Sequence, residues 1–295
     1  MKLAAIDIGS NAIRLQVSNV LHYQEAISFK KLEYVRFPLR LGQDVFNQQR
    51  ISEAKQEKFV KLMQAYQLLL ELYEVDDYLA FATSAMRESA NGEELARRVL
   101  EETGIRIEII DGDKEAEYIN RAVLVNLDTK PYLHIDVGGG STELTLLINH
   151  EKVASWSFPI GSVRRLEHHD APEVWQEMQQ WVQQHCGPLK GKLHAVGTGG
   201  NINKIFELAG KKPGKVLGRE KAEQVRAMLS DLSLEERINR LQLNPDRADV
   251  IVPASDIYLT VMRWAKAKGI FVPDVGLKDG MLRALYERQM EQRQA

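Results

Sequence analysis

Short apolar runs alternate with longer amphipathic segments along the first part of the chain. Apolar runs of a few residues between turn signals favour strands, whereas apolar residues recurring every three or four positions favour helices. The clearest helical stripe runs from Phe59 to Tyr73, after a potential N-cap at Ser52. The pattern predicts strands at 2–8, 13–20, 25–36, 78–82 and 105–110, with helices at 52–74, 91–104 and from 111 onward.

The second part of the chain repeats this alternation. It predicts strands at 132–135, 144–148, 152–158 and 193–196, with helices at 173–185, after the glycine turn 197–200, and at 277–294. Alternating strands and helices indicate an α/β protein. Since hairpins follow the first strand of each part, we expect mixed rather than purely parallel sheets.

One loop sequence occurs twice. Residues 6–15 align without gaps on residues 135–144, at an offset of 129 residues, and each copy places an aspartate and then small residues between two apolar strands. Small residues leave backbone N–H groups exposed to an anion such as phosphate. An ordinary Gly-rich hairpin explains one copy equally well, but the shared order of residues favours a pair of phosphate loops. The expected phosphate-binding residues are Gly9, Ser10, Asn11, Gly138, Gly139, Gly140, Ser141 and Thr142.

Composition narrows the class of protein. With 295 residues, of which 44% are hydrophobic, the chain is long enough for two domains with their own cores. A net charge of −2 offers no general attraction to nucleic acid or to a membrane surface, so we expect neither as a partner. No segment approaches the length of a membrane span, and no signal peptide is recognisable, which predicts a cytoplasmic protein.

Several other features are interpreted as structural. The single cysteine, Cys186, is a bystander, and the histidines His168, His169, His185 and His194 form no metal-binding signature. The basic stretch formed by 211–215 and Arg219 is interpreted as a solvated loop, with a ligand contact as the alternative. The glycine turn at 197–200 is weak evidence for nucleotide binding by itself.

A series of motifs then resembles one family. These motifs are 7–11, 82–87 with Asn91, Glu115-Ala116, 136–143, 159–164, 247–251 and 276–280, in that order. They are similar to the exopolyphosphatase and guanosine pentaphosphate phosphohydrolase (Ppx/GppA) family, within the sugar kinase, heat-shock-protein and actin superfamily. The resemblance implies two ribonuclease-H-like domains, at 1–125 and 126–295, that face each other across a cleft and contribute one phosphate loop each. The last helix is expected to pack back on the N-terminal domain.

The resemblance also implies roles for individual residues. Glu115 matches the position of the catalytic base, and Asp136 and Glu143 match positions that hold the attacking water or Mg²⁺, with Asp7 as their counterpart in the first loop. Arg14 and Arg87 are then the expected phosphate clamps, because a guanidinium binds two phosphate oxygens at once. Arg164 and Arg165 are interpreted as surface arginines, with a further phosphate contact from one of them as the alternative.

The sequence therefore predicts a Mg²⁺-dependent hydrolase that releases terminal phosphate from inorganic polyphosphate or from pppGpp. A homodimer and a monomer both stay open. The family's usual Ser or Thr is replaced by Ala12, the turn at 198–201 departs from the family pattern, and the end of the chain at residue 295 favours short substrates. Two alternatives stay open: an ATPase or kinase of the same superfamily, and a non-catalytic sensor that binds alarmone nucleotides.

Overall fold

The computed structural model describes residues 1–24, 26–189 and 193–294. By its internal contacts the chain divides into two compact units. Unit 1 comprises Met1–Ala122 together with Gly276–Ala295, and unit 2 comprises Val123–Val275. The division falls three residues before the boundary that the sequence predicts, and the last segment of the chain belongs to unit 1.

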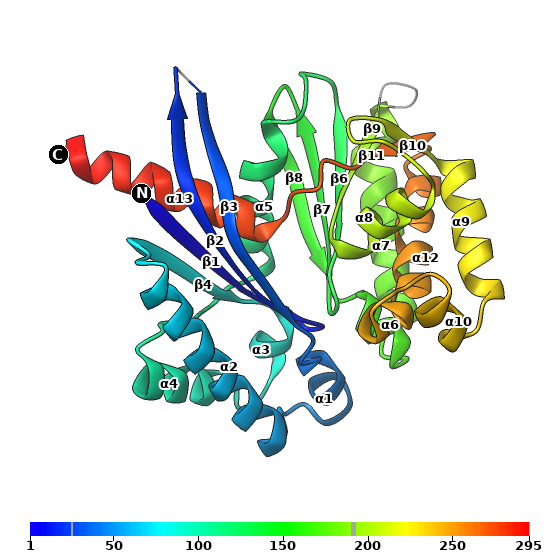
Figure 1. The fold of residues 1–295 in the computed structure, drawn as a ribbon. Coiled ribbons are helices and arrows are strands. Elements are labelled where there is room, and N and C mark those ends of the chain that lie inside the picture. The colour runs from blue at the N-terminus through cyan, green and yellow to red at the C-terminus, as the bar shows by residue number, and fades with distance from the viewer. Residues whose placement is uncertain (25, 190–192, 295) are drawn as a thin grey trace. The chain divides into compact units, whose positions relative to one another are not determined.

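Unit 1 is built on a five-stranded mixed sheet with the strand order β3-β2-β1-β4-β5. Figure 1 shows α2 and α4 together on one face of this sheet and α13 on the other. Its elements are β1 (Lys2–Ile8), β2 (Ile13–Tyr23), β3 (Ala26–Phe37), α1 (Leu41–Gln48), α2 (Glu53–Leu72), β4 (Asp77–Ala82), α3 (Ser84–Glu88), α4 (Gly92–Thr103), β5 (Glu108–Ile109), α5 (Gly112–Leu124) and α13 (Leu277–Gln294).

Burial explains why these segments pack in this way. The central strand β1 is buried from Leu3 onward, so a run of apolar residues serves both faces of the sheet. Helix α2 turns Phe59, Met63 and Tyr66 into the core, and the Tyr66 hydroxyl donates to the Ile13 carbonyl at 3.3 Å. The predicted helical stripe therefore packs as core.

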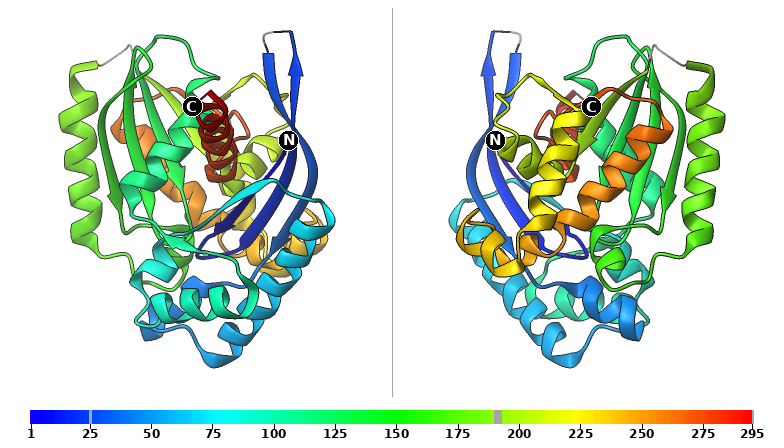
Figure 2. Two further views of the ribbon diagram at one scale, coloured as in Figure 1. Left: turned by 90° about the vertical axis from the view of Figure 1, so that its left-hand side faces the viewer. Right: turned by 90° about the vertical axis from the view of Figure 1, so that its right-hand side faces the viewer.

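Unit 2 is built on a six-stranded mixed sheet with the strand order β10-β11-β9-β6-β7-β8. Its central helix, α12, packs against α6, α7, α8, α9 and β6, as Figures 1 and 2 show. Its elements are β6 (Tyr132–Val137), β7 (Thr142–Ile148), β8 (Glu151–Phe158), α6 (Ser162–Leu166), α7 (Pro172–Cys186), the 3₁₀ helix Gly187–Leu189, β9 (His194–Thr198), α8 (Gly200–Leu208), β10 (Val216–Gly218), α9 (Arg219–Asp231), α10 (Leu234–Asn239), α11 (Pro245–Ala248), α12 (Ile251–Trp264) and β11 (Gly269–Phe271).

The two sheets repeat one topology. In each, an antiparallel meander of three strands is followed by a strand parallel to the first: β4 beside β1, and β9 beside β6. Even the irregularities correspond, because the register shifts between Val17 and Ser18 in β2 and between Leu146 and Leu147 in β7, at the same offset of 129 residues. The duplication seen in the loop sequence thus extends over the first four strands of each sheet.

The predicted elements differ from the structure in several places. Helices α1, α3, α6 and α9 to α12 and strands β10 and β11 were not predicted, and the strand expected at 105–110 pairs only at Glu108–Ile109. Asn91 stands at the start of α4 and makes no side-chain cap bond to the helix. Its side chain instead accepts from the Ile51 amide at 2.9 Å and donates to the Ile51 carbonyl at 3.0 Å.

Candidate functional site

The first loop is a tight turn between β1 and β2. The Gly9 amide donates to the Ala12 carbonyl at 3.2 Å, which closes the turn. The Ser10 hydroxyl is buried and shares a 2.8 Å hydrogen bond with the Ser84 hydroxyl. The loop is therefore held from its own backbone and from the start of α3.

Helix α1 docks directly on this loop. The Gly42 amide donates to the Ser10 carbonyl at 2.8 Å, and the Arg40 amide donates to the Asn11 carbonyl at 3.0 Å. A side chain at Gly42 would bring its Cβ to 2.9 Å from the Ser10 Cβ, so glycine permits the close approach of the helix. The unpredicted helix is thus part of the loop's support.

A charged pair stands beside the first loop. Asp7 on β1 lies opposite Arg14 on β2, and Arg14 Nη1 donates to Asp7 Oδ2 at 2.6 Å. Arg36 on β3 lies opposite Arg14 in turn. Because directly opposed residues share a face of the sheet, Asp7, Arg14 and Arg36 form one row, here called the first row. Arg36 was not identified in the sequence, although its place in the β2–β3 register follows from the hairpin.

The second loop has the same backbone design. The Gly138 amide donates to the Ser141 carbonyl at 2.9 Å, which matches the turn bond between Gly9 and Ala12. The Thr142 hydroxyl donates to the Ile160 carbonyl at 2.5 Å, so this side chain ties the loop to the segment after β8.

Helix α6 docks on the second loop as α1 docks on the first. The Val163 amide donates to the Gly139 carbonyl at 2.8 Å, and a Cβ at Gly161 would lie 2.4 Å from the same oxygen. Arg164 is buried, with Nε donating to the Gly140 carbonyl at 2.8 Å, so its interpretation as a surface arginine is wrong. Arg165 instead pairs with Asp170 at 2.6 Å and lies over the Trp175 ring.

The row beside the second loop carries the opposite charge. Asp136 on β6 lies opposite Glu143 on β7, which lies opposite Ser157 on β8. The Ser157 hydroxyl donates to Glu143 Oε1 at 2.7 Å. We call Asp136, Glu143 and Ser157 the second row.

Both carboxylates of the second row are buried, and each has an oxygen within 4.8 Å of one from the other. Two buried carboxylates at this separation, with hydroxyl donors beside them, form a ligand set that suits a hard divalent cation such as Mg²⁺. The donor set of unit 2 thus fits the cation that the sequence predicts.

Glu115 lies in the first turn of α5. The Asp111 side chain caps this helix by accepting from the Lys114 amide at 2.8 Å, and the Glu115 amide donates to the Asp111 carbonyl at 3.0 Å. The Glu115 side chain is buried, so the short capping segment holds an acidic group in a protected position. The predicted helix opening at 111–115 is confirmed.

Arg87 lies in α3 and is half-buried. Its Nη1 donates to the Ile110 carbonyl at 2.6 Å, immediately before the segment that caps α5. A guanidinium has five donor N–H groups, so one bond to the backbone is compatible with phosphate binding by the others. The bond also links α3 to the start of α5.

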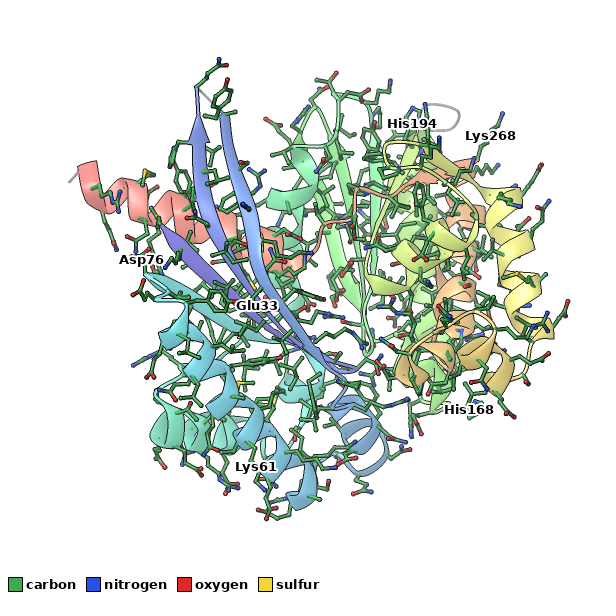
Figure 3. The ribbon with its side chains drawn as sticks, viewed as in Figure 1. Glu33, Lys61, Asp76, His168, His194 and Lys268 are labelled. Atoms are coloured by element: carbon green, nitrogen blue, oxygen red, sulfur yellow. The ribbon has the colours of Figure 1, made fainter. Side chains whose placement is uncertain are left out.

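The remaining sequence candidates lie apart from one another. Figure 3 shows His168 and His194 at opposite ends of unit 2, and His185 Nδ1 donates locally to the Trp181 carbonyl at 2.9 Å. Cys186 is buried, and burial raises the pKa of its thiol to about 12, as expected for a structural cysteine. Within the described ranges, no helix has the length and apolarity needed to cross a membrane.

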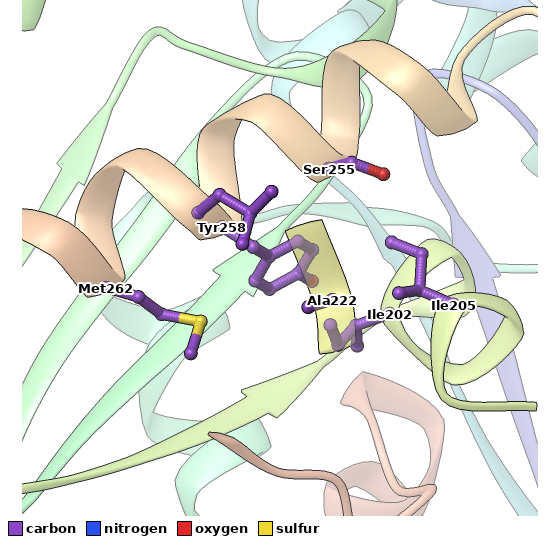
Figure 4. Close-up of a pocket in the computed structure, with 7 residues that line it drawn as sticks. Ile202, Ile205, Ala222, Ser255, Tyr258 and Met262 are labelled. Atoms are coloured by element: carbon purple, nitrogen blue, oxygen red, sulfur yellow. The ribbon is translucent and has the colours of Figure 1, made fainter. Parts of the chain in front are cut away.

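A small pocket between α8, α9 and α12 has an apolar lining (Figure 4). Ser255 in this lining donates to the Ile251 carbonyl of its own helix at 2.7 Å. Tyr258 also lines the pocket, but its hydroxyl bonds to backbone groups at the ends of β6 and β9. The pocket therefore presents no charged group for phosphate chemistry.

Two α/β units with mixed sheets, each carrying an aspartate and a small-residue loop between its first two strands, define a protein of the actin-like ATPase superfamily, as the sequence predicts. A model of the Ppx/GppA phosphatase family matches residues 20–289. The chain belongs to the Ppx/GppA phosphatase family, which indicates a phosphatase.

Relatives of known sequence and structure agree with this assignment. The chain is 30% identical to a bifunctional 3-dehydroquinate synthase/phosphatase of Fusobacterium nucleatum, with 96% of the chain but only 46% of that protein aligned. It is 23% identical to exopolyphosphatase 1 of Mycobacterium leprae, over 96% of the chain and 88% of that protein. The crystal structure of the Aquifex aeolicus Ppx/GppA family member superimposes with a TM-score of 0.78 at 26% identity, covering 98% of both chains.

Proposed function

We propose that the chain hydrolyses phosphoanhydride bonds and releases terminal phosphate from inorganic polyphosphate or from pppGpp. The observation that carries the proposal is the opposite charge of two rows on matched backbones. Arg14 and Arg36 stand beside the first loop, and Asp136 and Glu143 stand beside the second. Arginines suit the binding of phosphate oxygens, whereas buried carboxylates suit a cation and an attacking water.

In this proposal the first loop binds phosphate. The small residues Gly9, Ser10 and Asn11 present backbone groups to phosphate oxygens, and Arg14 adds a guanidinium beside them. Arg87 is the second proposed clamp. Asp7 orients Arg14 through their 2.6 Å ion pair, and its further role as a metal ligand, expected from the repeat, stays a prediction.

The second loop is proposed to bind Mg²⁺ and to orient water. Asp136 and Glu143 would hold the cation, which neutralises charge on the transferring phosphoryl group and lowers the pKa of bound water. Ser157 orients Glu143 through its 2.7 Å hydrogen bond. The backbone of 138–142 would bind phosphate oxygens alongside.

Glu115 is proposed as the general base that accepts a proton from the attacking water. Two points support the assignment: the match to the family motif, and the placement of this carboxylate in a capped first helical turn where burial restricts its motion. Replacement by glutamine keeps the shape of the side chain and removes the base.

Phosphate release from polyphosphate, pppGpp and ATP, measured in parallel with Mg²⁺ or with EDTA, tests the proposal. We expect release from polyphosphate or pppGpp that needs Mg²⁺, and a loss on the order of 10² or more in kcat for Glu115→Gln, with substrate binding retained. No release from either substrate would overturn the proposal. Hydrolysis of ATP alone would favour the kinase or ATPase alternative, and binding of pppGpp without release would favour a sensor.

A further inference from the structure

Asp136 is held by a residue from a distant part of unit 2. Thr198, at the end of β9, lies opposite Asp136 in the parallel β6–β9 register, and its hydroxyl donates to Asp136 Oδ1. His134, two residues before Asp136 and on the same face of β6, has Nε2 at 2.8 Å from the Thr198 hydroxyl oxygen. All three side chains are buried, and Thr198 and His134 are at most 1% exposed.

The direction of these hydrogen bonds follows from which group has a proton to donate. A threonine hydroxyl carries one proton, and Thr198 gives it to the Asp136 carboxylate. His134 Nε2 must therefore carry a proton and donate it to the Thr198 oxygen. The chain of donors runs from His134 through Thr198 to Asp136.

Tyr258 fixes the backbone around this chain of donors. Its hydroxyl accepts from the Val137 amide at 3.2 Å and donates to the Thr198 carbonyl. It therefore ties the residue after Asp136 to the residue that binds Asp136. The Tyr258 ring lies in the apolar pocket of Figure 4, where α12 holds it.

A glycine makes the close approach possible. Gly199 has a φ of +113°, and a Cβ there would lie 3.1 Å from the Tyr258 hydroxyl and 3.6 Å from Asp136 Oδ1. The glycine turn after β9 thus brings Thr198 against Asp136, which gives this turn a role that does not depend on nucleotide binding.

Unit 1 carries different residues at the positions of His134 and Thr198. At the offset of the repeat, Ala5 takes the place of His134, and Phe81 stands opposite Asp7 where Thr198 stands opposite Asp136. Asp7 is instead bound by Arg14 at 2.6 Å. Two aspartates on one backbone design are therefore anchored in different ways, one by a cation and one by neutral donors that leave its negative charge in place.

We propose that His134, Thr198 and Tyr258 are positioning residues that fix the orientation of the Asp136 carboxylate for cation and water. This inference rests on the proposed function of the second loop. Donors that hydrogen-bond to a ligating carboxylate set its direction, and their loss typically lowers metal affinity or activity by about 10- to 100-fold.

The sharpest test compares Thr198→Val with Thr198→Ser. Valine keeps the shape of threonine and removes the donor, whereas serine keeps the donor and removes a methyl group. Binding of Mn²⁺, measured by isothermal titration calorimetry, is one readout, and kcat and KM for phosphate release are the other. We expect Thr198→Val to weaken Mn²⁺ binding and kcat by about 10- to 100-fold, with KM within about twofold, and Thr198→Ser to lie close to the wild type.

A second pair of variants tests the direction of the donors. The side-chain amide of His134→Gln can place an N–H near the position of Nε2, whereas His134→Leu removes the donor. We expect the leucine variant to lose Mn²⁺ affinity and kcat, and the glutamine variant to recover most of both. Equal losses in two folded variants would overturn the role of His134, and this pair decides the question if Thr198→Val does not fold.

The same measurements distinguish failure of the positioning role from failure of the proposed function. Wild-type phosphate release together with unchanged Mn²⁺ affinity and kcat in Thr198→Val overturns the positioning role alone. A wild-type chain that binds Mn²⁺ but releases no phosphate overturns the function, while the titrations still decide the positioning role. A chain that neither binds Mn²⁺ nor releases phosphate overturns both.

Discussion

The two loops of this chain share a backbone and differ in the side chains beside it. Each turn is closed by one hydrogen bond between a glycine amide and the carbonyl three residues later. A helix packs on each turn, and a backbone amide of that helix donates to the carbonyl of the residue after the glycine, Ser10 or Gly139. Across the sheet, however, the first row reads Asp7, Arg14, Arg36 and the second reads Asp136, Glu143, Ser157.

In the duplicated loops the backbone hydrogen bonds are kept and the charged side chains differ. Bonds between backbone groups depend on the path of the chain, so they persist while side chains change. Charge depends on single residues, and one exchange between arginine and glutamate at the same register position changes the row by two units of charge. A single loop design can therefore present a cationic phosphate contact in one unit and an anionic cation site in the other.

The largest expected effect separates the two aspartates. Asp136→Asn removes the negative charge proposed to hold the cation, so we expect kcat to fall by about 10²- to 10³-fold and Mn²⁺ affinity to fall with it. Asp7→Asn is the matched variant at the same loop position. Because Arg14 already neutralises Asp7, its effect on Mn²⁺ affinity should be the smaller one. Equal losses in Mn²⁺ titrations of the two variants would show that both rows bind metal.

Arg14 tests the other side of the comparison. A charge-assisted hydrogen bond contributes about 1.5–3 kcal/mol, so Arg14→Gln should raise KM by about 10- to 100-fold, with a smaller change in kcat. Arg14→Lys keeps the charge and loses the planar fork, and we expect an intermediate KM. Steady-state phosphate release measures both.

Loss of Arg14 also leaves Asp7 without its ion pair. The double variant Asp7→Asn/Arg14→Gln removes that complication, because neither partner is then charged. If the double variant regained the wild-type KM, the effect of Arg14→Gln would come from the unpaired Asp7, and the phosphate-binding role of the first row would be refuted.

The glycines at the docking helices give the next effect, on stability. A Cβ at Gly161 would lie 2.4 Å from the Gly139 carbonyl oxygen, whereas the two nearest atoms to one at Gly42 belong to side chains, the Phe46 ring at 2.7 Å and the Ser10 Cβ at 2.9 Å. A backbone atom yields less readily than a side chain, so Gly161→Ala should cost about 2 kcal/mol and lower Tm by roughly 4–8 °C. Gly42→Ala should cost less. The reverse order in thermal unfolding would mean that the first loop is the more rigid of the two.

The features that the sequence could predict are those that depend on residues close together in the chain. The repeat, most strands and the opening of α5 depend on neighbouring residues, and they could be predicted from local pattern. Helix α1 could not be predicted in this way, because it has only eight residues and begins after Arg40, a non-glycine residue with a φ of 55°. No common start signal marks such a helix.

The residues that hold the second loop and Asp136 in place were harder to predict. Thr198 binds Asp136 across 62 positions and Tyr258 binds Val137 across 121, so neither contact has a local signal. Arg164 looked like a surface residue because arginine usually is one. Its burial comes from the docking of α6 on the second loop, where it bonds to the Gly140 carbonyl.

The smallest effect concerns one hydroxyl in the loops themselves. Ser141 in the second loop corresponds to Ala12 in the first, and both residues are buried. A neutral hydrogen bond contributes about 0.5–1.5 kcal/mol, so if the Ser141 hydroxyl contacts phosphate, Ser141→Ala should lower kcat/KM by roughly 2- to 12-fold. Ala12→Ser, the reverse exchange, should change kcat/KM by less than about twofold, because Arg14 already supplies the polar contact of the first row. Steady-state kinetics with the preferred substrate measures both variants, with Tm as a control for folding. A large gain in kcat/KM from Ala12→Ser would show that the first loop needs a hydroxyl donor that Arg14 does not replace. The two loops would then both depend on a hydroxyl for phosphate binding.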